Sequence, residues 1–297
     1  MTVIEVNDLL VAAPVRPVKR IGILLGDLKK TNVSALKYLL LSLNTRQRLF
    51  EYEFLPCKDG DELLVELSKK GLVDKEVVRT KVSAFLKSQQ EYLRAKNRSF
   101  ELKENPPDYF VLVTLTRFKR NYYSLREGQL SIIALGNWKR SMAPPTILEF
   151  LLTLVLRESV SAISNNLRGS IHLGTKSCLF DFTFRLDEAK FKVLNAFICD
   201  YCRRALDAEN LTNVADEVLA AMGKEWLGRS KNPQSPAGIV SKLGFNLFTT
   251  KGLEPTFLEN CLAVLRKDTV KELLKLVGTL LLLALVLILG LKGGAKE

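Results

Sequence analysis

The sequence predicts a mixed α/β protein, with a mixed sheet around a central apolar helix, a helical module after it and one C-terminal transmembrane helix. Three observations predict this class. Short apolar runs alternate with helical patterns in the first half, a strongly apolar segment follows Thr146, and residues 276–291 contain no charged residue.

Composition sets limits on function. The chain has 297 residues, a formal net charge of +12 and one histidine, His172. One histidine excludes any site that needs two imidazoles from one chain, including a three-histidine zinc site. Five cysteines are an odd and sparse set, which favours a reducing compartment over a disulfide framework. Residues 1–10 lack the basic start of an export signal.

The N-terminal part follows a β-α-β pattern. Apolar residues are interleaved with charges in two short runs, so we expect strands over 18–25 and 48–55 and a helix over 32–43 between them. Residues 60–98 are charged and helical in period. They predict two further helices, which end before the proline pair at 106–107.

Two buried strands and an apolar helix are expected next. The strands cover 108–115 and 129–135, with a basic connection between them. Thr146 and Glu149 have the spacing of a capping box, in which each side chain bonds the backbone of the other residue. The helix that begins at these residues has few polar side chains on any face, so it should lie at the centre of the fold.

A short strand and a long helix are expected to follow. The strand covers 178–184. Because side chains alternate between the two faces of a strand, one face would carry Cys178, Phe180, Phe182 and Phe184. The helix runs from about residue 188 to residue 206, with apolar residues at helical spacing.

The C-terminal segment predicts a membrane anchor. Residues 273–291 are apolar except for Lys275, and as a helix they would be about 28 Å long, against roughly 30 Å of hydrocarbon in a bilayer. A buried core helix is the alternative. Because six residues follow the span, we expect a tail-anchored, single-pass membrane protein whose N-terminal region is cytosolic and whose partner is the bilayer.

The anchor suggests three units and explains the positive charge. We expect a cytosolic α/β domain over 1–209, a helical juxtamembrane module over 210–270 and the transmembrane helix over 273–291. Basic side chains are stabilised near an anionic membrane surface, which would explain the excess of lysine and arginine. Contact with nucleic acid through the basic, tyrosine-containing residues 117–123 is the less favoured explanation.

One set of residues has the donor types of a metal site. His172, Cys178, Cys199 and Cys202 form the pattern H-x5-C-x20-C-x2-C. Three thiolates and one imidazole are a sufficient tetrahedral set for structural zinc, and they leave no open position for water. Buried reduced thiols, a redox pair, and a nucleophile pair of Cys178 with His172 are the alternatives.

The segment from Asp108 to Cys202 resembles the archaemetzincins, a family of metzincin-type zinc peptidases with a second, cysteine-bound zinc. The resemblance lies in the order of strand, strand, apolar helix and a cysteine-rich stretch. It implies a metzincin-like domain. It also aligns Cys178 and the Cys199-x-x-Cys202 pair with the family's second zinc site, where His172 would stand in for a missing cysteine.

The same resemblance implies a degenerate active site. The family's H-E-x-x-H-x-x-G-x-x-H motif would fall on the apolar helix, where only the glutamate, Glu158, is kept. Arg157, Ser161 and Leu167 stand where the motif has its three histidines. Without those ligands no catalytic zinc binds, and Glu158 has no metal-bound water to deprotonate.

These observations favour a non-enzymatic, membrane-anchored cytosolic protein that binds, senses or scaffolds, with an unidentified protein or small-ligand partner and structural zinc. A ligand-responsive membrane effector, whose anchors associate to disturb the bilayer, is the first alternative. A hydrolase with an unrecognised site is the second.

Overall fold

The computed structural model describes residues 18–169, 172–175, 177–183, 185–264 and 270–293. Within these residues the largest sheet has five strands in the order β2-β1-β4-β7-β6. Four strands are mutually parallel, and they are β1 (Lys19–Leu25), β2 (Phe50–Leu55), β4 (Tyr109–Thr114) and β7 (Leu130–Ala134). Strand β6 (Ser124–Glu127) runs antiparallel to β7. The expected mixed α/β fold with a mixed sheet is therefore confirmed.

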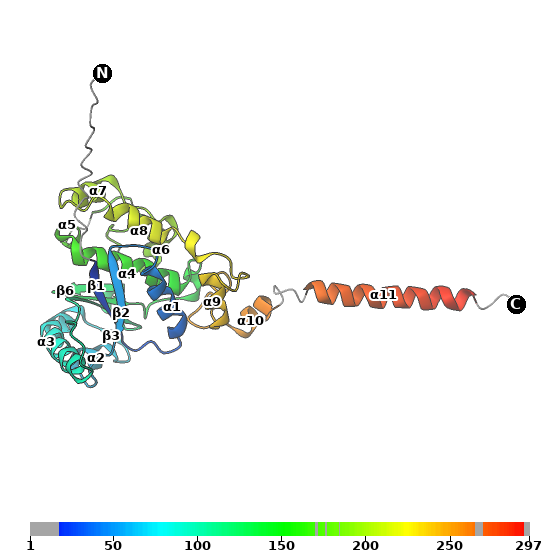
Figure 1. Ribbon diagram of the computed structural model, residues 1–297, viewed down its shortest axis with the longest axis horizontal. Helices are drawn as coiled ribbons and strands as arrows, with labels where there is room; N and C mark the ends of the chain where they lie inside the picture. The colour runs from blue at the N-terminus through cyan, green and yellow to red at the C-terminus, as the bar shows by residue number, and fades with distance from the viewer. Residues whose placement is uncertain (1–17, 170–171, 176, 184, 265–269, 294–297) are drawn as a thin grey trace, which may run out of the picture.

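Helices cover both faces of the sheet, as Figure 1 shows. Alternate residues of the strands face opposite sides: Val111 and Val113 belong to the core under the apolar helix, whereas Phe110 and Leu112 belong to the core on the other side. Burial on both faces explains why these strands read as continuous apolar runs. The first core packs against α1 (Val33–Leu43) and α4 (Ile147–Ile163), and the second against α2 (Glu62–Leu67) and α3 (Lys75–Ser99).

Helix α4 is the central apolar helix that the sequence predicts. Thr146 and Glu149 form the expected capping box, in which the Thr146 side chain accepts from the Glu149 backbone and the Glu149 carboxylate accepts from the Thr146 backbone. Residues 147–161 are all buried except Glu149. Among the buried residues are Arg157, Glu158 and Ser161, and burial of charged groups inside a core helix requires compensating partners.

The basic connection between β4 and β7 contains structure that the sequence pattern does not indicate. Its residues form β5 (Arg117–Phe118), which pairs with β3 (Leu72–Val73) in a small parallel sheet, the 3-10 turn η1 (Lys119–Asn121), and edge strand β6. A further 3-10 turn, η2 (Arg140–Met142), precedes α4. Strand β6 carries Arg126, whose guanidinium pairs with Glu158 of α4.

The structure differs from the expectation between residues 178 and 206. Isolated bridges join His172 to Asp181 and Cys178 to Phe197, in place of a regular strand over 178–184. Cys178 and Phe180 are buried but Phe182 is 38% exposed, and Phe184 lies outside the described residues. The single expected helix is divided into α6 (Leu186–Asn195) and α7 (Asp200–Asp207), with Ala196 in the left-handed conformation between them.

The remaining helices pack onto the core of α4. Val214 and Val218 of α8 (Val214–Met222) and Ala237 and Val240 of α9 (Pro236–Lys242) belong to that same core. Helix α5 (Asn165–Gly169), the turn η3 (Glu225–Leu227) and α10 (Phe257–Val264) complete this part of the chain. The division into units at residues 209 and 270 stays a prediction.

The expected membrane anchor is not supported. Helix α11 (Val270–Gly293) projects away from the other helices in Figure 1. In the part of the chain that the structure describes, no helix has both the length and the apolar character needed to cross a bilayer. The expectations of a transmembrane helix over 273–291, of a tail anchor and of a membrane location are therefore wrong.

Candidate metal centre

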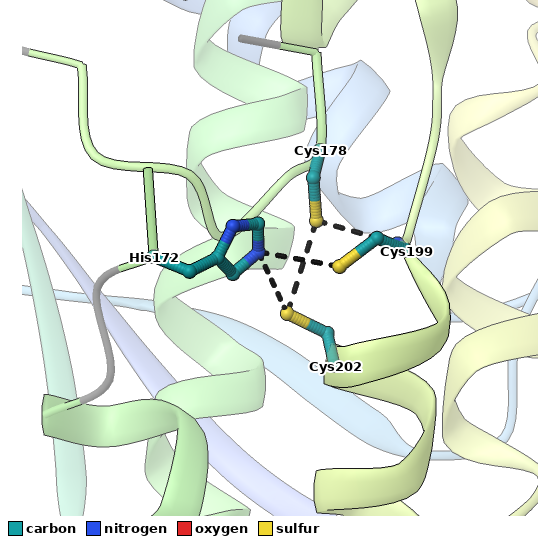
Figure 2. Close-up of side chains that lie close together, drawn as sticks. All are labelled: His172, Cys178, Cys199 and Cys202. Carbon is teal, nitrogen blue, oxygen red and sulfur yellow. Dashed lines mark hydrogen bonds between the residues drawn. The ribbon is translucent and has the colours of Figure 1, made fainter. Parts of the chain in front are cut away.

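The structure brings His172, Cys178, Cys199 and Cys202 together (Figure 2). One ligand atom of each lies within 4.8 Å of all the others. The Sγ atoms of Cys178 and Cys202 are 3.8 Å apart, and His172 Nε2 lies 3.1 Å from Cys202 Sγ and 3.3 Å from Cys199 Sγ. A tetrahedral zinc ion with Zn–S bonds of about 2.3 Å would separate its sulfur ligands by about 3.8 Å. The group could therefore hold a metal ion.

The division of the expected helix is what positions the two C-terminal thiols. Phe197 bridges Cys178, and the Leu179 N–H donates to the Phe197 carbonyl over 2.8 Å, so this segment is held extended next to Cys178. Helix α7 then begins with Cys199 as its N-cap and carries Cys202 in its first turn. The Cys199 backbone N–H is 3.4 Å from Cys178 Sγ, which places Cys199 beside the same point.

The Asp181 carboxylate lies beside the imidazole of His172. Its Oδ1 lies 2.7 Å from His172 Nδ1, which leaves Nε2 directed at the sulfur atoms. Asp181 is itself buried, and its other oxygen accepts from the Cys178 backbone N–H over 3.2 Å and from the Thr175 hydroxyl. A carboxylate behind a histidine is the usual support for a metal-binding imidazole, because it selects the tautomer and raises the basicity.

The thiols of Cys178 and Cys202 share one hydrogen bond. This hydrogen bond lowers the pKa of Cys178; burial opposes the shift, and the backbone N–H groups of Cys199 and Phe180 add to it. The same hydrogen bond with Cys178 raises the pKa of Cys202, because the pair shares a proton. Metal binding would release the protons of all three thiols, since thiolates are the ligands.

Arg157, Glu158 and Ser161 occupy a separate, ion-paired cluster on α4. Glu158 is fully buried, and its carboxylate accepts from Arg126, from Arg157 Nη1 over 3.0 Å and from the Ser131 hydroxyl over 2.8 Å. Burial opposes ionisation of Glu158, but the Arg126 and Arg157 guanidiniums hold its pKa below the usual range. Ser161 donates to the Arg157 carbonyl. The metal-ligand group found among the described residues contains none of these three.

Three residues of these clusters were missed by the sequence pattern. Asp181 follows Cys178 by three residues, a spacing that could have marked it as a partner of the cysteine loop. Arg126 lies on a strand too short to stand out from its basic surroundings. Lys192 is fully buried and donates to the carbonyls of Leu179 and Asp181, which ties α6 to the metal-ligand loop, and burial lowers its pKa to about 6.

The fold and the site together define a mixed α/β protein in which one histidine and three cysteines form a group able to hold a metal ion. The structure is similar to the crystal structure of archaemetzincin from Methanopyrus kandleri, with 11% sequence identity and a TM-score of 0.42 over 65% of this chain and 96% of that one. No protein-family model matches the sequence, and no curated protein matches it.

Proposed function

We propose that this chain is a non-enzymatic binding protein whose segment from His172 to Cys202 is cross-linked by one structural zinc ion. The convergence of four donor atoms within 4.8 Å carries the zinc part of this proposal. Three thiols and one imidazole favour zinc among common divalent ions, whereas calcium and magnesium require oxygen ligands. When bound, zinc would supply a cross-link between α7, the cysteine loop and the histidine loop. Four protein ligands leave no position for a substrate.

The surroundings of Glu158 support the non-enzymatic part of the proposal. A general base needs a carboxylate within hydrogen-bond reach of the proton it removes. Glu158 is instead closed off from solvent, and both of its oxygens are engaged by arginines. These arginines hold the carboxylate ionised and paired, which is a structural role. Glu158 is therefore a poor candidate for a catalytic base.

Zinc content is the first test. The full chain, purified under reducing conditions, should contain about one zinc ion, and Cys202→Ser should lose it. Zinc at about 1,000 times its Kd would stabilise the fold by about 4 kcal/mol. At about 2–4 °C per kcal/mol, the variant and the chelated wild type should both melt roughly 8–16 °C lower. Cys261→Ser, which changes a half-buried cysteine of α10 outside the metal-ligand group, is the matched control. A zinc-free wild type with the melting temperature of Cys202→Ser would contradict the proposal.

Hydrolysis is the second test. The zinc-loaded chain, incubated with a mixture of peptides, should release no fragments above the background of a heat-inactivated sample. Release of fragments by the wild type that is abolished in Glu158→Gln, with the fold of the variant intact, would show that Glu158 is a catalytic base and that the protein is a peptidase.

A further inference from the structure

A small cationic pocket lies beside the Glu158 cluster. Its volume is about 170 Å³, and it lies between α3, β6, α4 and α5. Four basic side chains line it, and they are Lys75, Arg126, Arg157 and Arg168. None of the described lining residues is acidic. We refer to it as the Arg157 pocket.

The positive charge of this pocket is only partly compensated. Glu158, buried beneath the pocket lining, pairs with Arg126 and Arg157 and supplies one negative charge against the four cations. The side chains of Arg126 and Arg157 are 17% and 8% exposed, so water screens them weakly. Burial and the neighbouring Arg79 lower the pKa of Lys75, and Glu76 opposes this shift. An anion in the pocket would offset this excess.

Arg157 also has one hydrogen-bond donor that finds no acceptor among the described residues. Its Nη1 donates to Glu158 and, over 3.5 Å, to the Ser124 hydroxyl. Its Nε is buried and has no acceptor among the described residues. A buried N–H group without an acceptor is destabilising, and native structures rarely keep one without a functional reason. By contrast, Arg126 uses Nε and Nη2 on Glu158 and Nη1 on the Arg168 carbonyl.

The size and walls of the pocket limit the ligand. A volume of about 170 Å³ has room for a small oxyanion group such as a phosphate. Tyr122 and the partly exposed Phe182 form apolar walls, and Lys75 Nζ lies 4.1 Å from the centre of the Tyr122 ring. An apolar or aromatic substituent could lie against them at the opening.

We infer that the Arg157 pocket binds the phosphate group of a small phosphomonoester. A phosphate dianion offers two charges and several acceptor oxygens to the three arginines and the lysine, whereas a carboxylate offers one charge and two oxygens. The inference rests on the proposed function in one respect: because Glu158 is engaged by arginines, the ester is held and not hydrolysed. The metal centre takes no part in it.

Calorimetric titration of the full, zinc-loaded chain tests the inference, with phenyl phosphate, inorganic phosphate and benzoate as the probes. Phenyl phosphate should bind most tightly, inorganic phosphate should compete with it, and benzoate should bind at least about tenfold more weakly, because it carries one charge and fewer acceptors. No heat of binding for either phosphate compound, with zinc present and the fold intact, would overturn the inference.

Variants locate the site. Lys75→Met and Arg157→Met should each weaken phenyl phosphate binding by about tenfold or more. Lys87→Met is the matched control, because it removes the same charge from an exposed position of the same helix, α3, and should change the Kd less than about twofold. Lys75 is half-buried and outside the Glu158 ion pairs, so its variant tests the pocket even if Arg157→Met fails to fold. An equal loss of phenyl phosphate affinity in Lys75→Met and Lys87→Met would show that binding depends on general charge attraction, and it would refute the Arg157 pocket as the site.

Phosphorus NMR of the same samples separates this inference from the proposed function. Phenyl phosphate should remain intact over hours of incubation. Binding of phenyl phosphate accompanied by release of inorganic phosphate would support the phosphate site and refute the non-enzymatic function. Intact phenyl phosphate without binding would refute the pocket and leave the non-enzymatic function standing.

Discussion

Replacing Glu158 by glutamine tests whether this carboxylate is structural. Glu158 is fully buried, and the two arginines that it pairs with are 17% and 8% exposed. Removing one partner from a buried ion pair costs about 3–5 kcal/mol, because the remaining charge is left uncompensated. Glutamine keeps one acceptor oxygen for Arg126 or Ser131, so we expect the lower end, about 3 kcal/mol. That corresponds to roughly 6–12 °C in melting temperature.

Urea unfolding followed by circular dichroism measures this loss directly. Glu127→Gln is the matched control, because Glu127 lies next to Arg126 on β6, is 43% exposed and pairs with Arg79 at the surface. An exposed pair of this kind contributes about 0–1 kcal/mol, so the control should change little. A Glu158→Gln variant whose free energy of unfolding falls by less than about 1 kcal/mol would refute the view that the ion pairs hold α4 against β6.

Two further predictions follow from the same helix. The pKa of Glu158 is depressed below 4.5, so its contribution is present above that pH and lost as the pH falls through the lower value in the folded state. The urea midpoint, measured from about pH 7 down to pH 3, should therefore fall more steeply for the wild type than for Glu158→Gln. If the midpoints of the two proteins fall in parallel, Glu158 does not have a depressed pKa in the folded state. Thr146→Ala removes the capping box of α4 and should lower the free energy of unfolding by about 1 kcal/mol. The melting temperature should therefore fall by roughly 2–4 °C. An unchanged melting temperature would show that packing alone fixes the start of the helix.

The sequence predicts the sheet and the central helix well, because their signals are local. Strands β4 and β7 read as continuous apolar runs, β1 and β2 as apolar residues beside or between charges, and α4 begins at a capping box. Strand β6 is four residues long and pairs only through its neighbour β7, so its existence depends on tertiary contacts. The membrane anchor was predicted from apolar length alone, and the described part of the chain does not support it.

The candidate site shows a similar division. The sequence predicts a metal site of one histidine and three cysteines, and the structure brings the four residues together, although Cys199 is a helix N-cap and not an interior residue of the expected helix. The break at Ala196 depends on the bridge between Phe197 and Cys178, a contact that local propensity cannot indicate. Asp181 and Arg126 gain their roles only through the folded arrangement, because each supports a residue far from it in sequence or on another element.

X-ray absorption at the zinc edge tests the central proposal, a closed structural zinc centre, most directly. For the full chain as purified, the account predicts three sulfur ligands at about 2.3 Å and one nitrogen at about 2.0–2.1 Å, unchanged when phenyl phosphate is added. A Cys202→Ser sample prepared in the same way should show no such sulfur shell. A zinc shell of nitrogen and oxygen only, or one with a bound water in place of a thiolate, would contradict the assignment of His172, Cys178, Cys199 and Cys202 as a structural site.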